Sequence, residues 1–520
     1  MDLRLPYRLA IGVIGNCSLA NREELRRRVK EAVDWIFKAY TSTDQTEIKL
    51  CVLSTLCDGS ERFAAGEILE LCEGSTLKAI LPLTISDCLE DFKSEASRDD
   101  FRRLLSVARH QLSLKEAPLR QEYPEELVSE ARRQAYEDVG KLIVRNCDVL
   151  VIVGDECALA SGGVLEKTIA FAREMKCPTC LINSKKLALP DYTERSGATA
   201  SLQAGIDAFN RRVAEFDPGA GYAQNVFDSI FCNSTIQKSM WPNDEIKKVI
   251  RNNLIPYYVT ASSLAKQYQK IYRRTGLTVF WLAFGIVSLV SAGIIFFNSS
   301  PYIFLVESFL LICISTLIAY AGKKRASHRN WIEHRFLAER IRSGIFIAAC
   351  NVEIPSELVD RRGKTAGESD AWMNLAFEEI WSRLPRLGGC NEENCQPLCD
   401  FAAKAWIDEQ IGFHERTCQK NLKRSRDLEL AGEVVFYIAM IVALLHFILP
   451  NIFPGFNEWS SAHVLTLFSL VLPALGATLG AVRSHREYKR LAMRSKKMVR
   501  TGFMTYLGTC NRLKLLTLKS

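Results

Sequence analysis

The chain has 520 residues, a formal net charge of +8 and a pI near 8.6, so its length allows two or three domains. The positive excess is accounted for by lysines and arginines that flank apolar segments and face anionic lipid. No basic strip with interleaved aromatic residues is present, so nucleic acid is not an expected partner. The chain has 17 cysteines, and we expect them to be reduced thiols because most of the chain is predicted below to be cytoplasmic.

The N-terminal third alternates strand and helix patterns. Its first residues lead directly into a strand and a turn, so no cleavable signal peptide is expected. Apolar runs typical of buried parallel strands alternate with amphipathic segments opened by glycine or polar turns. The predicted elements are a strand at 8–16, a helix at 18–39, a strand and helix within 47–72, a strand at 77–83, a polar segment at 86–124 with little strand, a helix at 136–146, a strand at 147–155, a helix at 161–175 and a strand at 178–184. This order predicts a Rossmann-like α/β domain over residues 1–186, with helices on both faces of a parallel sheet.

In such a sheet a ligand lies beyond the carboxyl ends of the strands, where glycine turns meet helix starts. The amides of Gly162 and Gly163 are placed to face a phosphate. Glu166 has two interpretations, a contact with a ribose hydroxyl or a charge that complements the helix dipole; Asp58 and Glu61 are either ligand contacts or residues of a solvated turn. The candidate ligand-binding residues are Gly12, Gly15, Asn16, Ser54, Asp58, Gly59, Glu61, Gly154, Ser161, Gly162, Gly163 and Glu166. No P-loop, H-E-x-x-H motif or nucleophile elbow is present, and no catalytic residue is assigned.

The motifs GVIGN, LSTLCDGSERFAAGEILE, LPLTISDCLEDFKSEASRDDF, AYEDVGKLIVRNCDVLVIVGD and SGGVLEKTIAFAREMKCP resemble, in order and spacing, the SLOG superfamily. That group is similar to LOG phosphoribohydrolases and to the cytosolic N-terminal region of TRPM channels. The resemblance implies binding of a nucleotide-derived signal, such as an ADP-ribose-like molecule or a cyclic nucleotide, with no tightly bound cofactor. The hydrolases carry P-G-G-x-G-T where residues 161–165 read SGGVL, and many relatives carry G-H-R where this chain has Gly15, Asn16 and Cys17. Ligand binding is therefore expected, and hydrolysis of an N-glycosidic bond is the alternative.

Two cysteine groups have alternative interpretations. Cys177-Pro-Thr-Cys180 has the spacing of a redox motif, but it lies between a helix and a strand rather than opening a helix, which favours a purely structural role. Cys390, Cys395 and Cys399, with Cys418 and His414 further on, could hold zinc, but their spacing matches no common zinc module, so no metal site is expected.

Two apolar hairpins follow a connector at residues 187–243. A helical segment begins at Asp244, bends at Pro256 and runs into the first hairpin. Each apolar block is about 20 residues long, enough to cross the ~30 Å hydrocarbon layer. The predicted spans lie at about 276–297, 302–321, 433–453 and 462–482. A hairpin buried in a soluble core is the alternative, although core helices rarely lack a polar stripe over this length.

Basic residues flank both hairpins and are missing from their short turns. The positive-inside rule then places both chain termini in the cytoplasm of a multi-pass protein of the cell (inner) membrane. The remaining regions are a first stalk and hairpin at 244–350, a cytoplasmic insert at 351–399, and a second stalk and hairpin at 400–520. Apolar residues recur at helical spacing beyond the spans, which predicts helical stalks that either hold the bundle together or transmit a signal.

The hairpins, together with HRFLAERIRSG and LPALGATLGAVRSHREYKRLAMRSKKM, resemble the SLATT family of membrane effectors associated with SLOG domains in bacterial defence. The resemblance implies a pore or membrane-disrupting output, which would require a homo-oligomer. Glu307, a carboxylate within the second span, is the candidate pore-lining residue, with interfacial placement as its alternative and His446 as a second candidate. The expected partners are the lipid bilayer and a nucleotide second messenger. The rivals to this function are a membrane-tethered hydrolase and a ligand-controlled scaffold.

Overall fold

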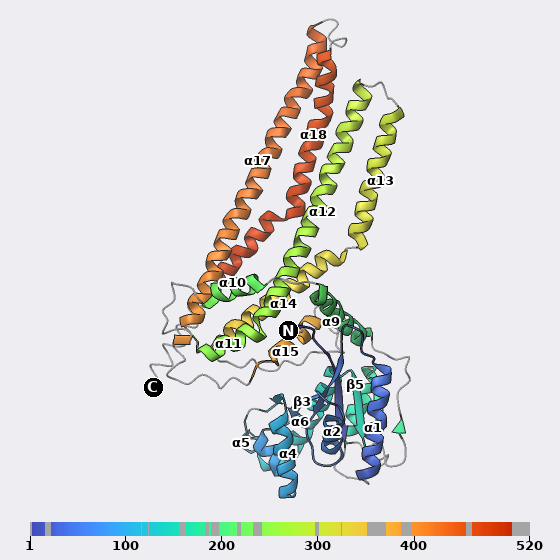
Figure 1. Ribbon diagram of the computed structural model, residues 1–520, viewed down its shortest axis with the longest axis vertical. Coiled ribbons are helices and arrows are strands. Elements are labelled where there is room, and N and C mark those ends of the chain that lie inside the picture. The colour runs from blue at the N-terminus through green and yellow to red at the C-terminus, as the bar shows by residue number, and fades with distance from the viewer. Residues whose placement is uncertain are drawn as a thin grey trace.

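A computed structural model shows an α/β domain at one end of an elongated molecule and long helical hairpins at the other (Figure 1). It describes residues 3–15, 22–115, 117–122, 124–154, 163–182, 187–188, 197–215, 220–231, 242–296, 301–323, 325–350, 371–385, 397–398, 400–453 and 460–501.

The α/β domain is built on one seven-stranded sheet with the order β4-β3-β2-β1-β5-β6-β7. Every neighbouring pair is parallel except β6 and β7. The strands are β1 (Tyr7–Gly15), β2 (Ile48–Ser54), β3 (Thr76–Leu81), β4 (His110–Ser113), β5 (Val149–Val153), β6 (Thr179–Ile182) and β7 (Leu187–Ala188). The predicted N-terminal parallel sheet with flanking helices is confirmed. Strand β4 was missed because its four residues lie in the polar segment and pair only with β3.

Helices cover both faces of the sheet, as the alternating side chains of β1 demonstrate. Leu9, Ile11 and Val13 face a core formed with α1, α2 and α4, whereas Ala10 and Ile14 face a second core formed with α6 and α8. These helices are α1 (Arg22–Ala39), α2 (Ser60–Leu71), α3 (Ile85–Glu90), α4 (Glu95–Val107), α5 (Leu119–Glu122), α6 (Glu125–Asn146) and α8 (Val164–Glu174). Burial on both faces explains why the strands read as continuous apolar runs.

The remainder of the described chain is mostly helical. Its elements are α9 (Gly197–Glu215), α10 (Ala220–Phe231), α11 (Asp244–Asn253), α12 (Ile255–Phe296), α13 (Pro301–Lys323), α14 (Arg325–Ala349), α15 (Ala371–Trp381), a π-helix (Ala403–Asp408), α17 (Glu409–Ile452) and α18 (Ser460–Arg486). The predicted break near Pro256 is found between α11 and α12. The larger core of the α/β domain continues through α9 and α15 into the bases of α12 and α14, so the two ends of the molecule share one hydrophobic cluster.

Three helices among the described residues are long and apolar enough to cross a membrane, namely Ile255–Phe296, Asp400–Leu449 and Ser461–Thr501. Their apolar windows are almost unburied within the chain, and large side chains such as Phe436 and Phe447 point outward with 65% and 72% exposed. Among the residues whose side chains the structure describes, α13 contributes the apolar stretch Leu305–Thr316. Outward-facing apolar surface of this extent is typical of helices whose solvent is lipid.

The predicted cytosolic extension of the last span differs in detail. Instead of one uninterrupted helix, α18 ends at Arg486, Glu487 takes a left-handed conformation with φ 47°, and helix resumes at residue 488. A residue with a side chain pays a steric cost at positive φ, so the bend at Glu487 is a local feature that the 3.6-residue periodicity did not indicate.

Candidate functional site

A pocket of about 390 Å³ opens at the carboxyl ends of β1 and β2. Strand order reverses between β1 and β5, because β2, β3 and β4 lie on one side of β1 and β5, β6 and β7 on the other. Ligands of open α/β sheets bind at this reversal point. The lining residues are Ile14, Gly15, Thr55, Cys57, Asp58, Glu61, Asp91, Phe92, Tyr136, Gly140, Val164, Leu165 and Thr168.

Two glycines allow the backbone to form the floor of this pocket. A Cβ on Gly15 would lie 2.7 Å from Ser60 Oγ and 2.9 Å from the backbone nitrogen of Glu61, so only glycine lets β1 end against the start of α2. Gly59, the residue before α2, has φ 101° and ψ −137°, which L side chains rarely adopt. Ser60 Oγ then donates to the Val153 carbonyl at 3.1 Å and ties α2 to the end of β5.

Glu61 is a buried carboxylate in the first turn of α2, with 3% of its surface exposed. Its Oε1 accepts hydrogen bonds from Ser54 Oγ, Thr55 N and Thr55 Oγ1, each at 2.7 Å. Burial raises the pKa of Glu61, while these donors and the backbone of Gly15 oppose the rise. Glu61 therefore joins the ends of β1 and β2 and holds the pocket in shape.

The opposite wall carries Asp91, Phe92 and Tyr136. The Tyr136 hydroxyl donates to Asp91 Oδ2 at 3.1 Å, and Arg132 also donates to Asp91. Burial raises the pKa of Tyr136 well above its ordinary value, and burial also raises the pKa of Asp91 despite the charge of Arg132. A phenol that stays protonated beside a carboxylate gives this wall both a donor and an acceptor.

Arg62 stiffens this wall from behind. Its guanidinium lies 4.3 Å from the centroid of the Phe92 ring and donates to the Leu56 carbonyl at 3.0 Å. Burial lowers the pKa of Arg62, although the charge of Asp58 opposes this. The aromatic face that Phe92 presents to the pocket is therefore held in place by a buried cation.

The described lining residues include three carboxylates, from Asp58, Glu61 and Asp91, and no lysine, arginine or histidine. Positive potential at this end of the sheet comes instead from the first turns of α2 and α8. Helix α8 packs closely on α6, because a Cβ on Gly140 would lie 2.4 Å from Thr168 Oγ1. The site thus combines an acidic, aromatic wall with two helix N-termini.

The structure brings several sequence-predicted residues to this pocket and places others around it. Gly15, Asp58 and Glu61 line it, Ser54 and Gly59 support Glu61 and α2, and Gly163 precedes the lining residue Val164. Gly12 faces α6, where a Cβ would lie 2.6 Å from Ile143 Cγ2; Gly154 donates its N–H to the Ile182 carbonyl; and Glu166 is exposed on α8. Asn16, Ser161 and Gly162 lie outside the described residues.

Sequence reasoning missed Asp91, Phe92, Tyr136, Gly140 and Thr168. Asp91 and Phe92 follow α3 within the polar segment, where no strand end marked them. Tyr136 and Gly140 lie one helical turn apart in the middle of α6, so their shared face could have been noticed, but only the fold shows which face of α6 meets the pocket.

The two cysteine hypotheses have different outcomes. Cys177 and Cys180 are buried thiols, Cys177 Sγ lies 3.7 Å from Cys147 Sγ, and burial raises the pKa of Cys180 to about 12. An unreactive thiol of this kind matches the structural interpretation. Cys390, Cys395 and Cys399 lie outside the described residues, and no cluster of potential metal ligands occurs in the part of the chain that the structure describes.

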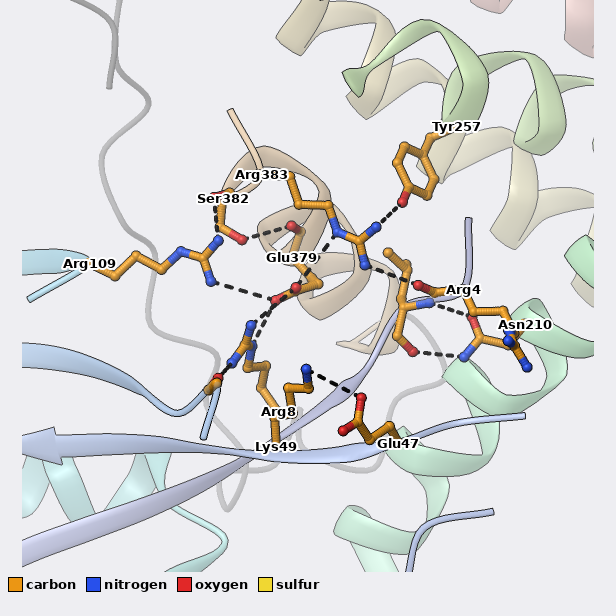
Figure 2. A network of polar contacts seen from close by, with 12 residues as sticks. Arg4, Arg8, Glu47, Lys49, Arg109, Asn210, Tyr257, Glu379, Ser382 and Arg383 are labelled. Carbon is orange, nitrogen blue, oxygen red and sulfur yellow. Dashed lines mark hydrogen bonds and ion pairs between the residues drawn. The ribbon is translucent and has the colours of Figure 1, made fainter. Parts of the chain in front are cut away.

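The amino ends of the strands, opposite the pocket, are attached to the helical part through α15 (Figure 2). Arg8, near the start of β1, makes a bidentate contact with Glu379 at 2.8 and 3.2 Å. Arg109 and Arg383 approach the same carboxylate at 3.9 and 3.8 Å. Burial alone would lower the pKa of Arg8, but the hydrogen bond and charge of Glu379 outweigh it and raise the pKa. Glu379 therefore gathers three guanidinium groups at the amino ends of the strands.

The neighbouring Glu378 binds Lys78 of β3 and lies 3.6 Å from His110 Nε2. Arg383 also donates to the Tyr257 hydroxyl near the base of α12 and to the Arg4 carbonyl at 3.0 Å. We call Glu378, Glu379 and their basic partners the α15 clasp. The clasp connects the sheet to the helix that leads into the first apolar hairpin (Figures 1 and 2).

Comparison of the chain with protein-family models, curated proteins and solved structures finds no match. The functional argument therefore rests on the pocket, the α15 clasp and the apolar helices.

Proposed function

We propose that this chain is a membrane effector in which a nucleotide-derived signal, bound in the α/β domain, triggers a transmembrane module. The observation that carries the proposal is the pocket of about 390 Å³ at the reversal point of the sheet, on the same chain as helices long and apolar enough to cross a membrane. A volume of this size suits a nucleotide-sized molecule. The resemblance to SLOG sensors and SLATT effectors is part of the same proposal, as is a role in bacterial antiviral defence.

In the proposed complex the sugar and base lie against the acidic, aromatic wall. Asp58 and Asp91 accept hydrogen bonds from ribose hydroxyls or an exocyclic amine, and the base packs on Phe92. The phosphate lies toward the N-terminus of α8, where Gly163 and Val164 supply backbone amides and the helix dipole favours an anion. This orientation keeps the phosphate away from the carboxylates.

In the membrane module, α13 is the fourth span beside α12, α17 and α18. As a helix of 23 residues it is long enough to cross the ~30 Å hydrocarbon layer. The turns of both hairpins then lie on the extracytoplasmic side of the membrane, and both termini lie in the cytoplasm. A pore requires several copies of the chain, and Glu307 of α13 is the proposed pore-lining carboxylate.

The path from pocket to membrane follows β1. Gly15 at one end of this strand lines the pocket, and Arg8 near the other end binds Glu379. A central strand of a parallel sheet moves as a rigid unit, so a ligand that shifts the end of β1 or the start of α2 also displaces the contacts of the α15 clasp. Through Arg383 and Tyr257, this displacement reaches the base of α12. The ligand drives the change only if it binds the two states with different affinity.

The carboxylates of the pocket give a hydrolase of the LOG type its best support, because N-glycosidic cleavage uses such groups. Glu61, however, already accepts three hydrogen bonds and serves the architecture of the site. A ligand-controlled scaffold remains the third candidate, and it predicts binding without any effect on the bilayer.

The test uses the purified full chain with NAD, ADP-ribose and a cyclic nucleotide. One of them should raise the thermal stability without release of free base, and should cause dye release from liposomes that carry the protein. At a ligand concentration of 100 times the Kd the gain is about 2.7 kcal/mol. Release of free base supports the hydrolase instead, and a thermal shift with dye-tight liposomes supports the scaffold.

A pocket-filling variant locates the site. Val164→Trp places an indole in the pocket and should abolish the ligand-induced shift. Val107→Trp is the matched control, because Val107 is 61% exposed at the end of α4, away from the pocket lining. Equal ligand affinity in the two variants would contradict the proposed site.

A further inference from the structure

Four helices meet at the foot of the apolar hairpins, and each contributes an arginine at that level. Arg273 comes from α12, Arg335 from α14, Arg424 from α17 and Arg486 from α18. We call these four residues the arginine cluster. Neither the pocket nor the α15 clasp includes any of them.

Contacts between adjacent residues place Arg273 beside Arg486. The rings of Tyr272 and His485 have centroids 5.1 Å apart. One turn further along α12, a Cβ on Gly276 would lie only 2.1 Å from His485 Nε2. Helices α12 and α18 therefore touch at this level. Arg273 directly follows Tyr272 on α12, and Arg486 directly follows His485 on α18.

The other two helices are set by further contacts. Arg483 of α18 pairs with Glu429 of α17 at 2.9 Å. Because α17 and α18 run in opposite directions as a hairpin, the step from Arg483 to Arg486 corresponds to a step from Glu429 toward Arg424. On the other side of α12, the Tyr268 ring lies 5.4 Å from the ring of His334, the residue before Arg335.

The positive charge of the cluster is poorly compensated. Burial lowers the pKa of Arg273, and the charges of Arg486, Arg424 and Arg335 lower it further. Helix α12 has no aspartate or glutamate between Ile255 and Phe296, and the nearby carboxylates of Glu487 and Glu429 pair with Arg490 and Arg483, outside the cluster. Among the described residues, Arg335 reaches Glu339 only at 4.0 Å. Four like charges gathered from four helices favour a bound anion.

The depth of the cluster indicates which anion it takes. Two of its members lie close to the lipid: Arg273 is three residues before the predicted start of the first span and Arg486 four residues beyond the predicted end of the last, about 5 Å into the headgroup layer for a helix near the membrane normal. Arg424 lies nine residues before the third span, about 14 Å farther down a straight helix. Guanidinium groups bind phosphate oxygens through paired N–H donors. Basic pockets between helices on the cytoplasmic side suit phosphate headgroups.

We propose that the arginine cluster binds the phosphate headgroup of an anionic lipid and thereby joins the two membrane hairpins. The inference rests on the membrane assignment made above but not on the nucleotide pocket. Arg273 and Arg335 belong to the first hairpin and its stalk, Arg424 and Arg486 to the second. One headgroup held by both pairs cross-links the hairpins at the cytoplasmic face.

The test places the full chain in nanodiscs of phosphatidylcholine with and without phosphatidylglycerol and measures retained phosphatidylglycerol by native mass spectrometry. Arg273→Gln and Arg424→Gln should each weaken phosphatidylglycerol binding about tenfold, the effect of losing a charge-assisted hydrogen bond. Arg274→Gln is the matched control, because it removes the same charge at the same depth from an exposed neighbour. Arg424 is exposed, so Arg424→Gln should fold normally even if Arg273→Gln does not.

Each other outcome refutes a defined part of the inference. Equal losses in Arg273→Gln and Arg274→Gln would reduce the effect to general attraction between basic residues and lipid, and would overturn the site. If inorganic phosphate in detergent stabilises the chain as much as phosphatidylglycerol does, the bound anion is not a lipid headgroup, and the proposed lipid ligand is wrong. Failure of every variant and of the parent chain to enter nanodiscs would refute the membrane assignment itself.

Discussion

Replacement of Glu379 by glutamine should weaken the attachment of the α/β domain to the long apolar helices. Glu379 is 7% exposed and receives both hydrogen bonds of Arg8, with Arg109 and Arg383 close by. Glutamine keeps one acceptor oxygen but removes the negative charge, so the three guanidinium groups repel one another with only the weaker influence of Glu378 on Arg8 and Arg109. Loss of one partner of a buried ion pair costs about 3 to 5 kcal/mol. Arg8 keeps its hydrogen bond to the Gly74 carbonyl at 2.6 Å, which places the expected cost near the lower value, about 3 kcal/mol.

Two measurements on the same variant distinguish a coupling role from a purely structural one. Urea unfolding of the full chain should show a first transition, that of the α/β domain, shifted by this amount. Ligand affinity of the pocket should stay unchanged, since Glu379 lies at the opposite edge of the sheet, while ligand-triggered dye release should fall.

Glu378→Gln is the comparison on the adjacent residue of α15. Its partners are Lys78 and His110, and 22% of the Glu378 side chain is exposed, so we expect a cost of about 1 kcal/mol. If Glu379→Gln destabilises no more than Glu378→Gln, the charge argument is wrong. If dye release in Glu379→Gln equals that of the parent chain, the α15 clasp does not carry the signal.

Two further predictions concern backbone strain and pH. Gly59→Ala should destabilise the α/β domain by about 1 to 3 kcal/mol because φ is 101° at this position, just before α2. Gly66→Ala, within α2 and with open space around it, should stabilise the domain by about 0.5 to 1 kcal/mol. Equal effects of the two substitutions in urea unfolding would exclude strain at Gly59. Burial lowers the pKa of His334 from 6.5 to about 4. Between pH 6.5 and 4 the unfolded chain therefore binds more protons than the folded one. The free energy of unfolding should fall by on the order of 3 kcal/mol as the pH is lowered through this range. His334→Phe, which keeps the ring packing with Tyr268 and Trp372, should remove this part of the pH dependence, and an unchanged slope between pH 6.5 and 4 would contradict it.

The pocket illustrates how far residue patterns reach. Gly15, Asp58 and Glu61 could be proposed because each follows a recognisable apolar strand, and strand ends of a parallel sheet share one edge. Asp91 and Tyr136 could not, since they come from a helix end and a helix middle whose orientation depends on how α3 and α6 pack. The same limit applies to Glu379, which is separated from its partner Arg8 by 371 positions in the chain.

Hydrophobic periodicity alone predicted the long strands and helices of the α/β domain, although not β4, and the long apolar helices of the hairpins. These features follow from local burial and length, which neighbouring residues record in their order. The tertiary structure decided which face of α6 closes the pocket, how α15 gathers arginines at the amino ends of the strands and where four arginines come together at the foot of the apolar helices. Such contacts depend on the packing of segments far apart in the chain, so their energies leave no local pattern to read.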